Sequence, residues 1–260
     1  MIENYLRTAW RNLLNNRTYS FINIAGLGLG LATGFIILMW VYQEYSMNMY
    51  HAKADRIYKI NAKIKFGDEE TVWETTPAPV ATVTRETISD VEKIALLKVN
   101  YGAKQVVKYG DKVFIEDKIG YTENTLFDIF DFPIVNGSEK KPLAEGLSVV
   151  LTEATAHRYF GNDDPLGKTI RFRDTLFTVS AVMKDFPASS SIEASMFFSM
   201  DIIRLKFRGN GQWKTIDQDW GNHNYASFCL MRKGAGTANA SQALLAATKK
   251  ANPNSSVIAY

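Results

Sequence analysis

The sequence contains a single cysteine, Cys229, among its 260 residues. One thiol cannot form an intramolecular disulfide, so the fold must depend on its apolar core. Cys229 has no identifiable base partner in the sequence, which makes it a poor candidate nucleophile. Because free cysteine is commonly found in protein interiors, we expect a buried thiol with a structural role.

The sequence also lacks a strong excess of charge of one sign. Its 30 Lys and Arg residues are nearly balanced by 27 Asp and Glu residues, and the formal net charge is +3. A nucleic-acid-binding protein would be expected to carry a clustered basic excess, so we expect no nucleic-acid partner. Hydrophobic residues make up 46% and charged residues 22%, a balance that is typical of globular proteins and argues against disorder.

Recognisable catalytic and metal-binding motifs are missing too. His51, His157 and His223 are the only histidines, and none has a partner at metal-ligand spacing, so we expect structural or solvated roles. The segment GNDDPLGKT at 161–169 resembles a phosphate-binding loop, but five residues rather than four separate its glycines. We interpret it as a helix stop followed by a turn. The sequence therefore predicts no catalytic residue, no metal and no cofactor, and we expect a protein that is not itself an enzyme.

One long apolar run dominates the N-terminal part of the chain. Residues 21–42 read FINIAGLGLGLATGFIILMWVY and include no charged residue. A helix of this length covers the ~30 Å hydrocarbon core of a bilayer, and we predict a transmembrane helix over 18–45. Tyr19 lies at one end and Trp40, Tyr42 and Tyr45 at the other, as in an aromatic belt. The run is longer than a signal-peptide core and no small-residue cleavage site follows it, which favours an uncleaved anchor.

Basic residues predict the orientation of this helix. Arg7, Arg11 and Arg17 precede the apolar run, whereas the next basic residue after it is Lys53. The positive-inside rule then places the N-terminus in the cytoplasm and residues 46–260 outside it.

Glycines recur within the apolar run at Gly26, Gly30 and Gly34, with Gly28 between them. Small residues at this spacing allow another helix to approach closely, and helix association in lipid depends on such approach. We predict that this stripe packs against other transmembrane helices. The alternative is that glycine is simply tolerated in a membrane helix.

Residues 1–17 have a helical pattern of their own, with apolar residues on one face and polar residues on the other. The apolar face comprises Tyr5, Leu6, Ala9, Trp10, Leu13 and Leu14. We predict a cytoplasmic amphipathic helix that lies on the inner leaflet, with Arg7, Trp10, Arg11 and Arg17 at the membrane surface. The alternative is a plain cytoplasmic tail.

Residues 46–260 combine strand and helix patterns. Period-two alternation, apolar runs and turn residues predict strands over 56–66, 94–99, 105–109, 112–121, 148–151, 169–172, 175–183 and 225–231. Helices are predicted over 76–88, capped by Thr76, over 152–160, closed by Gly161, and over 238–250. Turns are predicted at 67–68, 110–111 and 173–174. This mixture predicts an α+β domain with a mainly antiparallel or mixed sheet, either as one body or as two lobes that part within 136–142.

Two parts of the chain resemble a known family. The first is NYLRTAWRNLLNNRTYSFINIAGLGLGLATGFIILMWVYQEYSMNMYHAKADRIYKI, and the second includes FDIFDFPIVNG, LSVVLTEATAHRYFGNDDPLGKTIRF and FTVSAVMKDFP. They resemble ABC transporter permeases of the macrolide-exporter-like (MacB/FtsX) type, from Asn4 to about Pro187. The match indicates the family and leaves the substrate open.

The resemblance implies a permease subunit in the bacterial inner membrane with a MacB-like periplasmic core domain over 46–260. Such permeases form dimers with a second copy and work with a separate cytoplasmic ATPase subunit. The first transmembrane helix carries motion to the periplasmic domain, which drives substrate export or lipoprotein release. A periplasmic or outer-membrane partner is a further option.

The chain departs from this family in one respect. Family members have further membrane spans after the periplasmic domain, whereas this sequence ends at Tyr260 with none. We therefore expect either an N-terminal part of a longer permease or a truncated relative. The alternatives are a single-span anchored binding or sensor domain and, less favoured by the sequence, an anchored enzyme.

Overall fold

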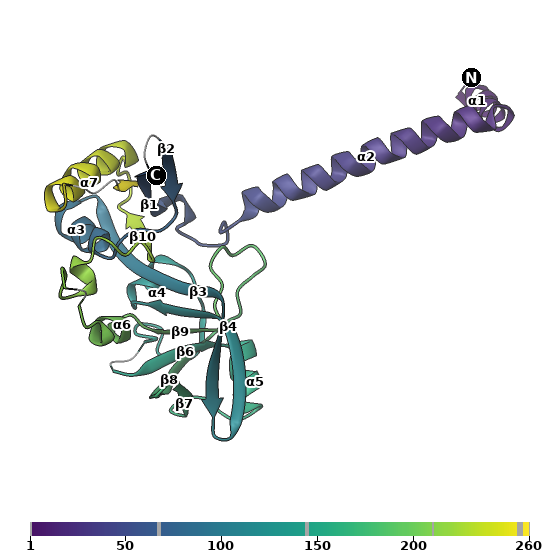
Figure 1. The fold of residues 1–260 in the computed structure, drawn as a ribbon. Coiled ribbons are helices and arrows are strands. Elements are labelled where there is room, and N and C mark those ends of the chain that lie inside the picture. Colours follow the sequence, from purple (N-terminus) through teal and green to yellow (C-terminus); the bar gives the residue numbers. More distant parts are fainter. Residues whose placement is uncertain (1, 67–68, 144–145, 210, 254–256, 260) are drawn as a thin grey trace. The chain divides into compact units, whose positions relative to one another are not determined.

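The structure is a computed structural model and describes residues 2–66, 69–143, 146–209, 211–253 and 257–259. The chain divides into two compact units, residues 1–49 and residues 50–260 (Figure 1). The first is helical and the second combines helices with a large sheet. The predicted α+β class with one N-terminal apolar helix is therefore confirmed.

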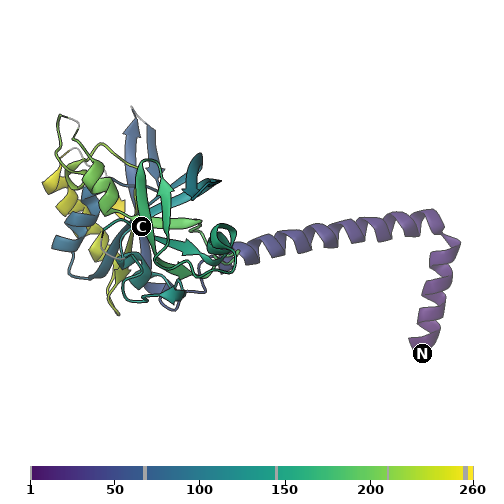
Figure 2. The same cartoon turned by 90° about the horizontal axis from the view of Figure 1, so that it is seen from below.

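The first unit consists of two helices, α1 (Ile2–Asn15) and α2 (Arg17–Ser46). Asn16, with φ −111° and ψ 57°, has a non-helical backbone, and the chain changes direction there (Figure 2). Helix α2 extends one residue beyond the predicted span at each end. At 30 residues it is about 45 Å long, more than the hydrocarbon core requires. Among the described residues it is the one helix that is long and apolar enough to cross a membrane.

The second unit is built on a single sheet with the order β11-β1-β10-β3-β4-β9-β6-β8-β5, in which β2 pairs with β1, and β7 pairs with β3 and β8. Its strands are β1 (Ile57–Phe66), β2 (Glu69–Trp73), β3 (Val91–Tyr109), β4 (Lys112–Thr122), β5 (Ile134–Gly137), β6 (Ser148–Thr152), β7 (Thr169–Phe172), β8 (Thr175–Met183), β9 (Met196–Ser199), β10 (Ala226–Met231) and β11 (Val257–Ala259).

Helices connect these strands and cover the sheet. They are α3 (Pro79–Thr87), α4 (Thr125–Ile129), α5 (Glu153–Phe160), α6 (Asp201–Lys206) and α7 (Thr237–Ala251), with short 3₁₀ turns η1 (Ala54–Arg56) and η2 (Ile216–Gln218). Alternate residues of β3 and β10 belong to two separate core clusters, so the central strands are covered on both faces. Helix α3 contributes to one cluster and α4 to the other. Burial on both faces explains why Ile94, Ala95, Leu96 and Leu97 of β3 form a continuous apolar run rather than an alternating pattern.

The prediction of two strands over 94–99 and 105–109 was wrong. Both segments belong to the single long strand β3, whose pairing with β4 shifts register between Tyr101 and Gln105. Gly102, with φ +73°, lies inside this shift. A glycine within a strand often marks such an irregularity, and here it bends the strand without ending it.

The predicted capping role of Thr76 was also wrong. Helix α3 begins at Pro79, and Thr76 instead bridges to Tyr225 in the sheet. Its hydroxyl lies 2.7 Å from that of Ser227 in a fully buried position. The hydrogen bond to Ser227 of β10 satisfies the Thr76 hydroxyl in the interior, where an unpaired polar group would be costly.

Other predicted elements agree with the structure. The hairpin turns at 110–111 and 173–174 join β3 to β4 and β7 to β8, and helix α5 ends at Gly161. The turn predicted at 67–68 lies outside the described residues. The segment 136–142, where two lobes would part, begins within β5, which pairs with β8 in the common sheet. Residues 50–260 therefore form one compact unit across this segment.

Candidate functional site

The glycines of α2 lie on an uncovered helix surface. A Cβ atom added at Gly26, Gly30 or Gly34 would meet no other atom within 4 Å. At roughly 100° per residue these three glycines share one side of the helix, whereas Gly28 lies about 200° around from Gly26. The described chain leaves room for a second helix backbone along this side, and the packing role of the stripe stays a prediction.

Helix α1 presents its predicted membrane-surface residues to the exterior. Arg7 and Arg11 lie one turn apart on the same side, and Trp10 is 66% exposed. Arg17 begins α2, and its Nε donates a hydrogen bond to the Leu14 carbonyl at 3.3 Å. Arg17 therefore helps to satisfy the end of α1, a role that the sequence reasoning missed. The side chain of Leu6, predicted on the apolar face, lies outside the described residues.

A second feature is the junction segment, which we define as residues 50–56, at the start of the second unit. The His51 ring is 4% exposed and lies between aromatic rings, with centroids 5.0 Å from Phe130 and 5.6 Å from Phe132. Its Nδ1 accepts a hydrogen bond from the Asp131 backbone N–H at 3.0 Å. Burial lowers the pKa of His51, although the nearby Asp131 carboxylate acts in the opposite direction. The ring is thus held neutral as an acceptor, and the expected structural role fits this position.

Further hydrogen bonds fasten the junction segment to distant parts of the domain. The Ala52 backbone N–H donates to the Asp131 carboxylate, and Lys53 Nζ donates to the Asp128 carbonyl at 2.6 Å. At the two ends of the segment the partners are Tyr50 with Ser190 at 3.0 Å, and Arg56 with the Met231 carbonyl at 2.9 Å. The segment is therefore held at several points along its length.

We call this set of hydrogen bonds between residues 50–56 and the rest of the domain the clamp, and sequence reasoning missed it. Its partners lie about 75 to 175 residues away along the chain, beyond the reach of periodicity or turn patterns. The one local signal was the aromatic and acidic run FDIFDF at 127–132, which supplies both Asp128 and Asp131. Within this run Asp131 contacts the junction segment through its carboxylate, whereas Asp128 contributes its backbone carbonyl and its carboxylate pairs with Lys93.

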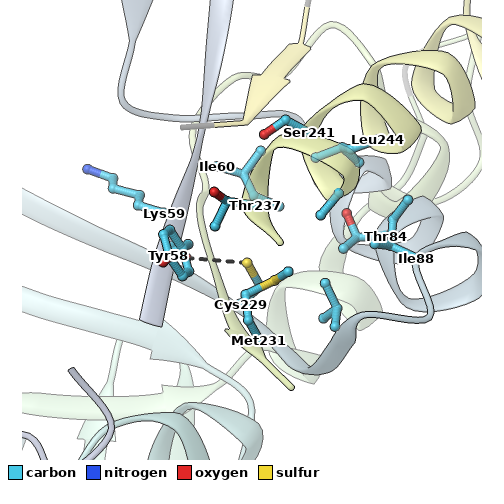
Figure 3. Close-up of a pocket in the computed structure, with 12 residues that line it drawn as sticks. Tyr58, Lys59, Ile60, Thr84, Ile88, Cys229, Met231, Thr237, Ser241 and Leu244 are labelled. Carbon is cyan, nitrogen blue, oxygen red and sulfur yellow. Dashed lines mark hydrogen bonds between the residues drawn. The ribbon is translucent and has the colours of Figure 1, made fainter. Parts of the chain in front are cut away.

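Cys229 lies in a small apolar pocket between β1, β10, α3 and α7 (Figure 3). The cavity is about 30 Å³, roughly the space of one water molecule. Cys229 is 5% exposed and its Sγ donates to the Tyr58 carbonyl at 3.5 Å, so the predicted buried thiol is confirmed. Burial raises the pKa of Cys229 to about 12, which keeps it as an unreactive thiol near neutral pH.

The glycine-rich segment 161–169 forms a helix stop and a turn, as predicted. Gly161 ends α5 with φ +65°, and Lys168 Nζ pairs with the Asp163 carboxylate at 2.9 Å. A phosphate-binding loop would need its lysine and backbone N–H groups directed at the ligand. Within the described residues, no cluster of His, Cys, Asp and Glu is arranged to hold a metal ion.

The fold and these features define a class: a helix able to span a membrane, followed by an α+β domain whose first residues are clamped to its core. The family model of the MacB-like periplasmic core domain matches residues 20–247. The chain belongs to this family, and its domain is of the kind found in permease-type proteins of ABC transporters.

Three solved structures share the fold. A domain of a candidate permease protein from Porphyromonas gingivalis is 22% identical, with a TM-score of 0.65 over 81% of this chain and 89% of that one. The periplasmic region of MacB from Actinobacillus actinomycetemcomitans is 16% identical, with a TM-score of 0.57 over 83% and 90%. The extracellular domain of the noncanonic ABC-type transporter YknZ from Gram-positive bacteria is 10% identical, with a TM-score of 0.55 over 78% and 99%. No curated protein matches the chain at a significant level.

Proposed function

We propose that the chain is the N-terminal part of a permease subunit of an ABC transporter of the macrolide-export or lipoprotein-release type. It is anchored in the bacterial inner membrane by α2, with its N-terminus in the cytoplasm and residues 46–260 in the periplasm. Its role is to convert ATP hydrolysis by a separate cytoplasmic subunit into a conformational change of the periplasmic domain. Family membership, the apolar helix α2 and the basic residues before it support this proposal.

The observation that carries the mechanical role is the clamped junction segment. Only three residues, 47–49, separate the end of α2 from Tyr50. The four Cα–Cα steps from Ser46 to Tyr50 span at most about 14 Å when extended, so a displacement that takes the helix end farther than this from Tyr50 must move the clamp. The clamp then passes the displacement to 128–131, to Ser190 and to Met231 on β10. A loosely attached linker would instead absorb the displacement.

The helical unit fits the partners of such a permease. The side of α2 that carries Gly26, Gly30 and Gly34 is proposed to pack against membrane helices of the permease dimer, which forms with a second copy. Helix α1 is proposed to rest on membrane lipid, where arginines are attracted to anionic headgroups. A periplasmic or outer-membrane protein that contacts the domain belongs to the same proposal.

The test is to reconstitute the gene product with its ABC ATPase in nanodiscs and to follow hydrogen exchange with and without ATP. In the wild-type protein we expect ATP to change the protection of amides in 128–132 and 186–192. A matched variant carries a flexible Gly-Gly-Ser-Gly insertion between Asn48 and Met49. We expect the insertion to retain ATPase binding but to remove the ATP-dependent change in protection.

Two outcomes would count against the proposal. If no ABC ATPase co-purifies with the gene product in gentle detergent, the single-span anchored binding or sensor domain becomes the better interpretation. If the insertion variant shows the same ATP-dependent protection as the wild type, the domain is driven by another route and the clamp has no role in transmission.

A further inference from the structure

A second pocket, which shares no lining residue with the one at Cys229, lies between β3, β4, the β7–β8 hairpin and α6. Its volume is about 280 Å³, enough for a small organic molecule. Its lining combines aromatic or aliphatic residues with basic ones: Lys98, Asn100, Tyr121, Phe172, Arg173, Phe177, Ile202, Ile203, Lys206 and Phe207. Among these described residues none is acidic.

Three cations therefore border one pocket and have polar or aromatic neighbours. Lys206 Nζ donates to the Thr175 hydroxyl at 3.1 Å, and an Arg173 nitrogen lies 3.4 Å from the Gln105 side-chain oxygen. Lys98 Nζ lies 5.7 Å from the centroid of the Tyr225 ring. Burial and then the charge of Arg173 lower the pKa of Lys98, so the positive charges at this pocket oppose one another. An anion placed between them would relieve that repulsion.

The backbone at Arg173 adds a second observation. Arg173 occupies the β7–β8 turn with φ +55°, a region in which Asn, Asp and Gly are far more common than arginine. Its guanidinium carbon lies 5.2 Å from the centroid of the Phe172 ring. Non-glycine residues in this region cost free energy and are found at ligand clamps and other functional sites. The turn carries a strained arginine at the rim of the pocket, where a turn-forming residue would be more stable.

A comparison within the same domain shows that this charge pattern is particular to the pocket. A larger cleft beside Arg204 also contains basic side chains, but Glu123, Asp201 and Asp217 all lie within ion-pair distance of Arg204. The positive charges of that cleft are balanced by its own carboxylates. The pocket at Lys98 borders three cations and no carboxylate among its described lining residues, so a bound anion would be attracted there.

We propose that this pocket binds an amphipathic anion, in which a phosphate or carboxylate head contacts Lys98, Arg173 and Lys206 and an apolar body lies against Tyr121, Phe177 and Phe207. The head could belong to a lipid, to an amphiphilic small molecule or to a free inorganic ion, and the apolar lining favours a ligand with a tail. The proposal goes beyond the transport function, because a binding domain without an ATPase would hold the same ligand.

The test uses the full chain in nanodiscs of zwitterionic lipid, titrated by calorimetry with octyl phosphate below its micelle concentration, and with empty nanodiscs as the blank. Octanol carries a similar tail without charge, octyltrimethylammonium reverses the charge, and inorganic phosphate carries the head without a tail. We expect octyl phosphate to bind at least roughly tenfold more tightly than each of these, since charge-assisted contacts and apolar burial both contribute.

Variants separate the pocket from the rest of the surface. We expect Lys98→Met, Lys206→Met and Arg173→Asn each to weaken octyl phosphate binding by roughly tenfold or more. The matched control is Lys104→Met, which removes an exposed lysine of β3 outside the pocket and should leave binding unchanged. Arg173→Asn should also raise the thermal midpoint, because asparagine tolerates the positive φ better than arginine. A loss of binding in this variant is then not caused by unfolding.

Three results would overturn the proposal. Equal binding of octanol would show a purely apolar site, and equal binding of inorganic phosphate would show a simple anion site without a place for a tail. An equal loss in Lys104→Met would show that octyl phosphate responds to the overall charge of the domain.

Discussion

At the residue scale, the main features are side chains that hold distant segments together inside the domain. His51 of the junction segment accepts a hydrogen bond from the Asp131 backbone N–H. Glu116 of β4 accepts one from the Tyr159 hydroxyl of α5. Both are polar groups that are nearly inaccessible to solvent, with exposed fractions of 4% and 3%. A buried polar group without its partner costs free energy, so each of these contacts contributes to the choice of a single packing arrangement.

Protonation of His51 is predicted to destabilise the domain. Unfolded histidine has a pKa near 6.5, and burial lowers the pKa values of His51 and His223 in the folded domain. The unfolded chain therefore binds more protons below about pH 6.5, and the free energy of unfolding should be highest above that pH and should fall as the pH decreases toward 5. Urea unfolding between pH 5 and 7.5 measures this trend.

The variant His51→Phe isolates the contribution of the junction. Its free energy of unfolding should change less steeply over this pH range than that of the wild type, because one of the groups that bind protons on unfolding is removed. If both proteins show the same slope, His51 exchanges protons equally in the folded and unfolded states, and the neutral-acceptor role is wrong.

Replacing Glu116 should destabilise the attachment of α5. The Glu116 carboxylate accepts hydrogen bonds from the Tyr159 hydroxyl at 2.8 Å and from the Arg158 guanidinium. We expect Glu116→Gln to lower the free energy of unfolding by about 1–2 kcal/mol, since a charge-assisted bond at a buried acceptor is lost. The control Glu193→Gln breaks a solvent-exposed ion pair with Lys118 and should change the free energy of unfolding by much less, because water screens that pair. Equal effects would contradict the importance of burial.

At the element scale, close packing between strands determines which small residues are required. On β4, Gly120 pairs with Phe197 of β9, and the Phe197 ring lies directly over it. On α2, by contrast, the glycines have open space around them within the described chain. Glycine therefore has two uses here. At Gly120 it makes room for the Phe197 ring inside the domain, and along α2 it leaves a surface that another helix can approach.

A methyl group at Gly120 should not fit. A Cβ atom there would overlap the Phe197 ring, which is fully buried and cannot move away cheaply. We expect Gly120→Ala to lower the free energy of unfolding by about 1–3 kcal/mol, the usual cost of overpacking. Asp117→Ala, at an exposed site on the same strand, is the control. A neutral Gly120→Ala would show that β9 is loosely held.

The glycine stripe of α2 can be tested by comparing substitutions on two sides of the helix. We expect Gly30→Ile to weaken crosslinking between membrane helices of the assembled protein, because the side chain would block close approach. Gly28→Ile adds the same bulk on the other side of the helix and should leave crosslinking intact. Unchanged crosslinking in Gly30→Ile would support the alternative that glycine is simply tolerated there.

At the scale of the whole molecule, the basic residues of the N-terminal part should determine how the protein inserts. Arg7, Arg11 and Arg17 lie on the N-terminal side of the apolar helix. Alkaline phosphatase fused after Tyr260 should therefore be active, because it folds only outside the cytoplasm, and a green fluorescent protein at the N-terminus should fluoresce. Replacing all three arginines by glutamate should reduce phosphatase activity. Full activity in that variant would show that other features set the orientation.

Local patterns were enough to predict much of the fold. The apolar run predicts α2, alternation predicts β1 and β8, and turn residues predict both hairpins, because these features depend on neighbours a few residues apart. Short elements were missed for the opposite reason. Strands β5 and β9 have four residues each and, unlike the equally short β7, no predicted hairpin turn beside them; they become strands by pairing with β8, β4 and β6. Strand β2 was also missed, and it pairs antiparallel with β1.

The sequence by itself determined the division into an apolar helix and an α+β domain, because hydrophobic length and periodicity are local properties. The tertiary structure alone decided which distant residues act together. It brings Asp128 and Asp131 to the junction segment and joins Lys98 of β3 with Arg173 of the β7–β8 turn and Lys206 of α6. Strand order and register create these groupings, and they depend on contacts between segments that no local pattern connects.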